Sequence, residues 1–184
     1  MPTKQTRMTI RVDKITTLGA ADMDNLCQAT EDAIRDGIGF SWVTPPVREM
    51  MESYWKGVLL VPERELFGGW LDGTLCASVQ LLRPGKNKET SYFSAGIESH
   101  FVAPWARGHG LARMLLQAAE REAASSGFTV LRLSVRETQE AALQLYQDNE
   151  YIRWGILPYH EFVGGQMVAG HYFYKKLERL SSVE

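Results

Sequence analysis

One short run, Arg107-Gly108-His109-Gly110-Leu111-Ala112, constrains this chain more than any other part of its sequence. An apolar-leaning segment, residues 97–102, precedes it, and the strongly helix-forming sequence LARMLLQAAEREAA begins at Leu111. A glycine-bearing turn between a strand and a helix leaves several backbone N–H groups unpaired at the helix N-terminus, where the helix dipole is positive. Together with the charge of Arg107, these groups predict a site for a phosphorylated ligand.

The run alone leaves a second interpretation open, an ordinary connection between a strand and a helix with capping glycines. Its glycine spacing differs from the G-x-G-x-x-G of dinucleotide-binding folds and from the G-x-x-x-x-G-K-[ST] of nucleotide triphosphate loops. The rest of the chain therefore has to discriminate between a ligand site and a plain turn.

Composition narrows the class of protein. With 184 residues, 45% hydrophobic and 23% charged, the chain can form one globular domain with a sizeable core. A net charge of −2 gives no general basic surface, so we expect neither a nucleic-acid partner nor a membrane partner. Cys27 and Cys76 lack metal-ligand spacing and are interpreted as buried free thiols, with no metal site. The N-terminus has no apolar signal core, and we expect a cytoplasmic protein.

Hydrophobic periodicity predicts an N-terminal strand and two helices, followed by a group of strands. A helix, a strand, a second helix and two closing strands come after them. This order indicates a single α/β (α+β) domain over residues 8–177, with a central mixed, mostly antiparallel sheet flanked by helices. Helices are expected at residues 20–36, 44–58, 111–125 and 137–149. Strands are expected at residues 8–12, 65–71, 74–82, 90–102, 128–135, 151–157 and 171–177.

Two motifs on either side of the strand at 128–135 point to one family. Residues 107–112 fit the spacing R/Q-x-x-G-x-G/A, and residues 139–146 fit N-x-x-A-x-x-L-Y with Gln139 in place of the usual Asn. These motifs, in this order of elements, resemble the GNAT N-acetyltransferase superfamily. The segment YIRWGILPYHEFVGGQMVAGHYFYKKL near the C-terminus is similar to the tabtoxin-resistance type of acetyltransferase.

The resemblance implies acetyl-CoA as the acyl donor and a primary amine, expected to be that of a small molecule, as the acceptor. Direct transfer in a ternary complex is expected, because no cysteine or serine stands in a nucleophile constellation. Two alternatives stay open at this point, a non-catalytic acyl-CoA sensor and an acetyltransferase of proteins or peptides. The residues that the resemblance implies for contact with CoA are Val102, Ala103, Arg107, Gly108, His109, Gly110, Leu111, Ala112, Gln139 and Tyr146.

Two residues are the catalytic candidates. The resemblance implies that the phenol of Tyr146 donates a proton to the leaving thiolate, although an amphipathic helix could equally place a tyrosine in the core. Gly96 stands where several family members carry a glutamate that acts as the general base. If the strand is regular, Glu98 and His100 point the same way as Gly96, so Glu98 is the expected base and His100 a weaker candidate. A solvent-facing glutamate on a half-exposed strand is the alternative for Glu98.

The C-terminal segment carries the remaining expectations. His160 and Glu161 precede Gly164-Gly165, in a connection that often borders the acceptor cleft of this fold, and they are candidates for substrate selection. The apolar C-terminal strands permit a homodimer without requiring one. Because an acceptor cleft is assembled from distant segments, the sequence specifies the donor better than the acceptor.

Overall fold

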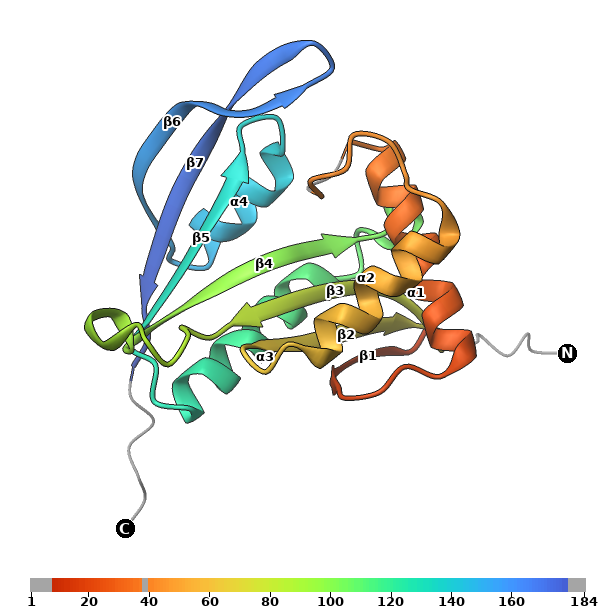
Figure 1. Cartoon of the computed structure of the whole chain (residues 1–184), viewed down its shortest axis with the longest axis horizontal. Coiled ribbons are helices and arrows are strands. Elements are labelled where there is room, and N and C mark those ends of the chain that lie inside the picture. The colour runs from red at the N-terminus through yellow and green to blue at the C-terminus, as the bar shows by residue number, and fades with distance from the viewer. Residues whose placement is uncertain (1–7, 38–39, 179–184) are drawn as a thin grey trace, which may run out of the picture.

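The structure is a computed structural model that describes residues 8–37 and 40–178. Within these residues, seven strands form one sheet in the order β1-β2-β3-β4-β5-β7-β6, and four α-helices flank it (Figure 1). Neighbouring strands are antiparallel except β4 and β5, which are parallel. The predicted single domain with a mixed, mostly antiparallel sheet is confirmed.

Most elements lie where the hydrophobic pattern predicts them. The predicted strand at 90–102 is shorter at its start, because residues 89–91 form a 3₁₀ turn, η1, and a second such turn, η2 (Pro104–Ala106), follows the strand. The strands are β1 (Ile10–Ile15), β2 (Arg64–Leu71), β3 (Thr74–Leu82), β4 (Ser94–Val102), β5 (Val130–Arg136), β6 (Ile152–Val163) and β7 (Gln166–Lys176). The helices are α1 (Ala20–Arg35), α2 (Arg48–Leu60), α3 (Leu111–Ser125) and α4 (Glu140–Asp148).

Helices cover both faces of the first half of the sheet. In Figure 1, α1 and α2 lie in front of β2 and β3, and α3 lies behind them. Leu115 and Leu116 of α3 are fully buried, and burial of each such side chain contributes about 2 kcal/mol. Gly69 of β2 allows this close approach, since a Cβ at that position would lie 3.0 Å from a methyl of Leu111. None of the helices in the described part of the chain is long and apolar enough to cross a membrane.

The sheet opens between β4 and β5. These strands pair only where Ser94–Gly96 meets Val130–Arg132, and beyond this point they diverge (Figure 1). A β-bulge in β4 accompanies the opening: Ser99 has φ +47°, and Ser99 and His100 together face a single residue of β3. A bulge bends its strand and redirects its side chains. Residues 97–100 of β4 and 134–136 of β5 therefore lie on opposite sides of a cavity between the two halves of the sheet.

The C-terminal strands form a hairpin rather than two separate short strands. The turn is Gly164-Gly165, with φ +59° and +80°, values that suit a two-residue hairpin loop. The predicted strands at 151–157 and 171–177 therefore extend to the turn from both sides. His160 and Glu161, expected in a connection, lie within β6 instead.

Candidate functional site

The turn before α3 has the geometry of an anion cradle. Gly108 and Gly110 both have φ +83°, and Gly110 is the N-cap of α3. The first hydrogen bond of the helix runs from Met114 N–H to the Gly110 carbonyl, at 3.1 Å. Among the described residues, the backbone N–H groups of residues 108–113 have no backbone acceptor. Such a row of donors at a helix N-terminus suits a phosphate.

Arg107 lies at the edge of this cradle. Its guanidinium forms an ion pair with Asp36, with 2.8 Å between Nη2 and Oδ2, and its Nε donates to the Val102 carbonyl at 3.4 Å. Both members of the ion pair are partly exposed, so the pair is weakly held. A phosphate in the cradle can therefore compete with Asp36 for the guanidinium.

A cavity of about 840 Å³ adjoins this turn; we name it the turn cavity. Of the ten residues expected to contact CoA, Ala103 and His109 do not line it, and Ala103 is fully buried with its N–H donating to the Cys76 carbonyl at 2.8 Å. The buried Nε2 of Gln139 has no hydrogen-bond partner among the described residues, so a ligand atom can fill that role. The residues that line the turn cavity are 36–37, 100–102, 106–108, 110–113, 138–142 and 145–146.

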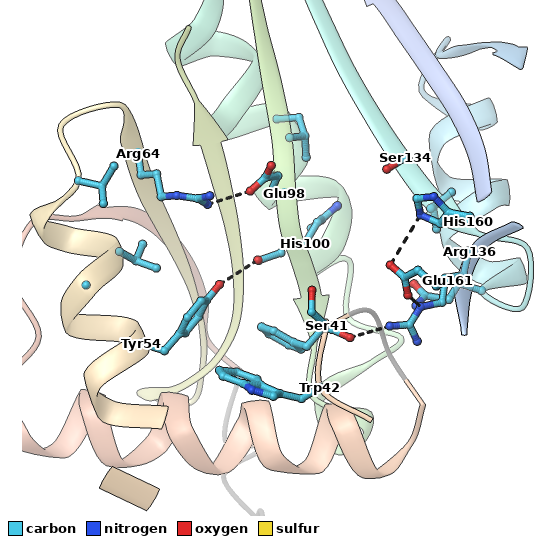
Figure 2. A pocket seen from close by; sticks show the side chains of 18 of the residues that line it. Ser41, Trp42, Tyr54, Arg64, Glu98, His100, Ser134, Arg136, His160 and Glu161 are labelled. Carbon is cyan, nitrogen blue, oxygen red and sulfur yellow. Dashed lines mark hydrogen bonds and ion pairs between the residues drawn. The ribbon is translucent and has the colours of Figure 1, made fainter. Parts of the chain in front are cut away.

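A second cavity, of about 680 Å³, lies between the diverging strands; we name it the cleft cavity. Polar side chains line one of its walls, and Figure 2 shows the ion pair of Arg64 and Glu98 among them. Arg64 Nη1 donates to Glu98 Oε2 at 2.8 Å and to Gln80 Oε1 at 2.6 Å, and Gln80 Nε2 donates to the Tyr54 hydroxyl at 3.0 Å. These hydrogen bonds fix one oxygen of the Glu98 carboxylate. The residues that line the cleft cavity are 40–42, 53–54, 57–58, 61, 64, 97–100, 134–136, 139, 146 and 160–161.

The facing wall comes from β5 and β6 and carries a second ion pair (Figure 2). Arg136 is nearly fully buried, pairs with Glu161, and donates from Nη2 to the Phe40 carbonyl at 2.6 Å. His160 lies beside Glu161, and its Nδ1 is 3.1 Å from the Tyr172 hydroxyl. A buried guanidinium that satisfies both a carboxylate and a carbonyl holds the backbone of Phe40 against this wall. His160 and Glu161, expected at the acceptor cleft, do line the cleft cavity.

The two cavities meet at three residues, His100, Gln139 and Tyr146, which line both. The Tyr146 hydroxyl is 3.0 Å from His100 Nδ1. Burial raises the pKa of the Tyr146 phenol and lowers the pKa of His100 to about 4. Both groups are therefore neutral near pH 7. A neutral phenol at the junction of two cavities can donate a proton to a group that enters from either side.

The expected common direction of Glu98 and His100 is wrong. Glu98 turns toward Arg64, whereas the ring nitrogens of His100 contact Tyr146 of α4 and the Ala112 carbonyl of α3. The bulge at Ser99 is the physical reason, because an inserted residue ends the regular alternation of side chains along β4.

Several residues of the cleft cavity escape local sequence reasoning. Trp42 and Tyr54 form an edge-to-face aromatic pair on one side of it, with ring centroids 5.1 Å apart. Arg64 and Arg136 supply the two guanidinium groups described above. None of these four residues belongs to a motif. They are too far apart in sequence for any short pattern to show that they line one cavity. Within the described ranges, no group of three His, Cys, Asp or Glu side chains is arranged to hold a metal ion.

Comparison with known sequences gives two matches. The sequence profile described as the Acetyltransferase (GNAT) family matches residues 27–151. The uncharacterized N-acetyltransferase in the hisH–hisA intergenic region of Azospirillum brasilense is 55% identical over 130 residues, which are 71% of this chain and 77% of the relative.

Comparison with solved structures gives the same fold. An N-acetyltransferase from Staphylococcus aureus Mu50 superposes with a TM-score of 0.78 at 16% identity, covering 92% of this chain and 99% of the other. A GNAT superfamily phosphinothricin acetyltransferase from Sinorhizobium meliloti, in complex with acetyl-CoA, gives a TM-score of 0.75 at 15% identity, covering 96% and 92%.

Proposed function

The chain belongs to the GNAT family of acetyltransferases, and from this premise we propose that it moves the acetyl group of acetyl-CoA to a primary amine of a small molecule. The observation that carries the proposal is the meeting of two cavities at Tyr146, His100 and Gln139. The bond from the amine nitrogen to the acetyl carbon forms and the carbon–sulfur bond breaks. A base takes one proton from the amine, an acid gives one proton to sulfur, and exchange with solvent returns both groups to their starting protonation states. With both ligands bound, the acetyl group crosses the junction without a covalent enzyme intermediate.

We assign the pyrophosphate to the turn and the thioester end to the junction. The unpaired N–H groups of residues 108–113 and the charge of Arg107 would hold the phosphates. Gln139 Nε2 would donate to the pantetheine arm, and a backbone N–H near Val102 would stabilise charge on the thioester oxygen. Leu111 and Ala112 would contact the donor through the first turn of α3, His109 would contribute only at the rim, and the fully buried Ala103 would make no contact with it.

Tyr146 is the proposed proton donor to the departing sulfur. It lines both cavities, and burial keeps its phenol protonated. A thiolate leaves more readily when a nearby hydroxyl supplies a proton.

Glu98 is the proposed base. Oε2 is bound by Arg64, which leaves Oε1 to face an amine in the cleft cavity. We expect Glu98→Gln to lower kcat/KM for the amine about 100-fold, because positioned acid–base groups contribute about 10²- to 10⁴-fold. The measurement is the pH–rate profile, in which the limb due to the base should disappear. The Kd of acetyl-CoA should not change, since Glu98 does not line the turn cavity. An unchanged profile and an unchanged kcat/KM would exclude Glu98.

A small acceptor suits the cleft cavity better than a protein. Its volume of about 680 Å³ falls within the range of ordinary small-molecule sites, about 300–1,000 Å³. Ion pairs bound it on both sides, Arg64 with Glu98 and Arg136 with Glu161. The similarity of the C-terminal segment to tabtoxin-resistance enzymes is consistent with a small acceptor. Free-thiol release with amines, amino acids and antibiotics, but not with peptides, is the expected pattern.

The rival function, an acyl-CoA sensor without catalysis, is motivated by Gly96, which puts no carboxylate at the usual position of the base. Calorimetry with acetyl-CoA tests the property that the sensor and the enzyme share, which is binding of the acyl donor. We expect one binding site, and absence of heat up to millimolar ligand would contradict both functions. Binding without thiol release across the amine panel would favour the sensor.

We further propose that residues 8–177 form one acetyltransferase domain that works in the cytoplasm. All seven strands, from β1 to β7, contribute to the same sheet. Cys27 and Cys76 are both buried as free thiols, which suits a reducing compartment.

We also propose a homodimer that forms through β6. This edge strand and the start of β7 expose large apolar side chains to solvent, and exposed apolar patches mark interaction surfaces. The exposed side chains are Ile152, Trp154, Ile156, Leu157, Tyr159, Phe162 and Met167.

The oligomeric state tests this surface. In light scattering after size exclusion, the protein should have about twice its chain mass of 20.8 kDa. Trp154→Glu should return the mass to that of one chain, because a charge would be buried in the interface. Val47→Glu is the matched control, since Val47 is equally exposed but lies at the start of α2. A dimer that survives Trp154→Glu would place the interface elsewhere.

A further inference from the structure

Three groups from three elements form a continuous hydrogen-bonded chain at the junction of the cavities. The Ala112 carbonyl, in the first turn of α3, is 2.9 Å from His100 Nε2. His100 Nδ1, on β4, is 3.0 Å from the Tyr146 hydroxyl on α4. The chain joins the phosphate turn to the phenol that the proposed function uses.

The chemistry of these partners fixes the tautomer of the imidazole. A carbonyl oxygen only accepts, so Nε2 must carry a proton and donate to Ala112. Burial lowers the pKa of His100 to about 4, so the ring carries a single proton at neutral pH. Nδ1 is therefore the acceptor, and the Tyr146 O–H must donate to it.

We propose that His100 is a positioning residue for Tyr146: in the free protein it holds the phenol oxygen at the junction and ties it to the first turn of α3, and during transfer the O–H rotates from Nδ1 to the departing sulfur. This inference rests on the proposed role of Tyr146. Without the imidazole, the hydroxyl would lose the acceptor that fixes it, and the phenol ring would lose the polar link to the turn that His100 provides. Small displacements of a reacting group are costly in rate, even where binding is unaffected.

The surroundings of His100 favour this role over simple packing. The next two residues of β4, Phe101 and Val102, are buried apolar side chains that serve packing. His100 instead forms a hydrogen bond with each ring nitrogen: Nε2 contacts the first turn of α3, and Nδ1 contacts α4. It is also one of the three residues that line both cavities.

A double-mutant cycle tests the proposal. His100→Leu removes both hydrogen bonds at similar size, and His100→Gln keeps one acceptor and one donor. We expect His100→Leu to lower kcat about tenfold, which is the loss of one well-placed hydrogen bond, with the Kd of acetyl-CoA changed less than about threefold. His100→Gln should recover most of kcat. In the Tyr146→Phe background, His100→Leu should cause no further loss, because its effect passes through the missing hydroxyl.

A readout that does not depend on turnover accompanies the cycle. The ¹⁵N NMR signals of the His100 ring in the free protein should show a protonated Nε2 and an unprotonated Nδ1, and Tyr146→Phe should shift Nδ1 far more than Nε2. Equal losses of kcat from His100→Leu in both backgrounds, wild-type kcat in His100→Leu, or a protonated Nδ1 would each overturn the positioning role. Loss of kcat in Tyr146→Phe with normal kcat in His100→Leu would overturn this inference alone. If the unmodified protein releases no thiol with any amine, the proposed function itself fails, while the NMR signals still report on the hydrogen-bonded chain.

Discussion

Tyr146→Phe is expected to lower kcat about 100- to 1,000-fold, the usual range for loss of a positioned proton donor. The ring itself stays packed, because Phe retains the contacts with Tyr151 and Phe173, whose centroids lie 5.6 Å and 6.0 Å from that of Tyr146. Without the hydroxyl, the sulfur must leave as a free thiolate. The Kd of acetyl-CoA should change little, since most of the turn cavity is formed by the turn, α3 and the start of α4. Steady-state kinetics with saturating amine measure kcat, and calorimetry measures the Kd.

Tyr151→Phe is the matched control for that substitution. Tyr151 belongs to the same aromatic cluster and is equally buried, but it is not among the described residues that line either cavity. We expect Tyr151→Phe to retain kcat within about twofold, as for a substitution that touches no reacting group. Full turnover in Tyr146→Phe, with acetyl-CoA still bound, would reduce Tyr146 to a packing residue.

Gly110→Asp is expected to weaken acetyl-CoA binding about 100-fold relative to Gly110→Asn. Gly110 has φ +83° and is the N-cap of α3, and Asn and Asp are both tolerated in the left-handed region and both serve as N-caps. A Cβ at this position meets no atom within 4 Å. The two variants therefore differ mainly in one negative charge beside the proposed pyrophosphate. Two like charges about 6 Å apart repel by about 2.8 kcal/mol at an effective dielectric constant of about 20, which is about 100-fold in Kd.

Salt separates charge repulsion from distortion of the turn. The difference in Kd between the Asp and Asn variants should shrink as ionic strength rises, because exposed charges are screened. Thermal melting of Gly110→Asp and Gly110→Asn should agree within a few degrees, which shows that the turn is intact in both. Equal Kd values for the two variants at low salt would place the pyrophosphate away from residue 110.

Local chemistry made part of this molecule predictable. The Asp72-Gly73 pair predicts a tight turn, and both residues have positive φ between β2 and β3, whose bounds match expectation within one residue. The glycines at 108 and 110 likewise adopt the left-handed conformation that opens the row of unpaired N–H groups before α3. In each case the residues that determine the conformation are neighbours in sequence.

Distant partners made the rest unpredictable. The bulge at Ser99 depends on the register of β4 against β3, and no glycine or proline marks it. Arg136 donates to a carbonyl 96 positions away, and His100 contacts a hydroxyl 46 positions away. The hairpin turn at Gly164-Gly165 is a different case, because a pair of glycines is a local turn signal. The apolar runs on either side of it are short, so they predicted two separate short strands and not one long hairpin. The residues of the turn that would hold the donor are neighbours in sequence, whereas the residues that line the cleft cavity come from distant parts of the chain.

The central claim is that two cavities bring a thioester and an amine together at Tyr146 for direct transfer. The release of free CoA thiol, followed with acetyl-CoA held saturating while the amine concentration is varied, tests it most directly. We predict release that depends on the amine and saturates with it, one N-acetyl product per thiol, and an unchanged mass of the protein when acetyl-CoA is added alone. Thiol release that is independent of amine, or acetylation of the protein by acetyl-CoA in a form that a later addition of amine discharges, would contradict direct transfer.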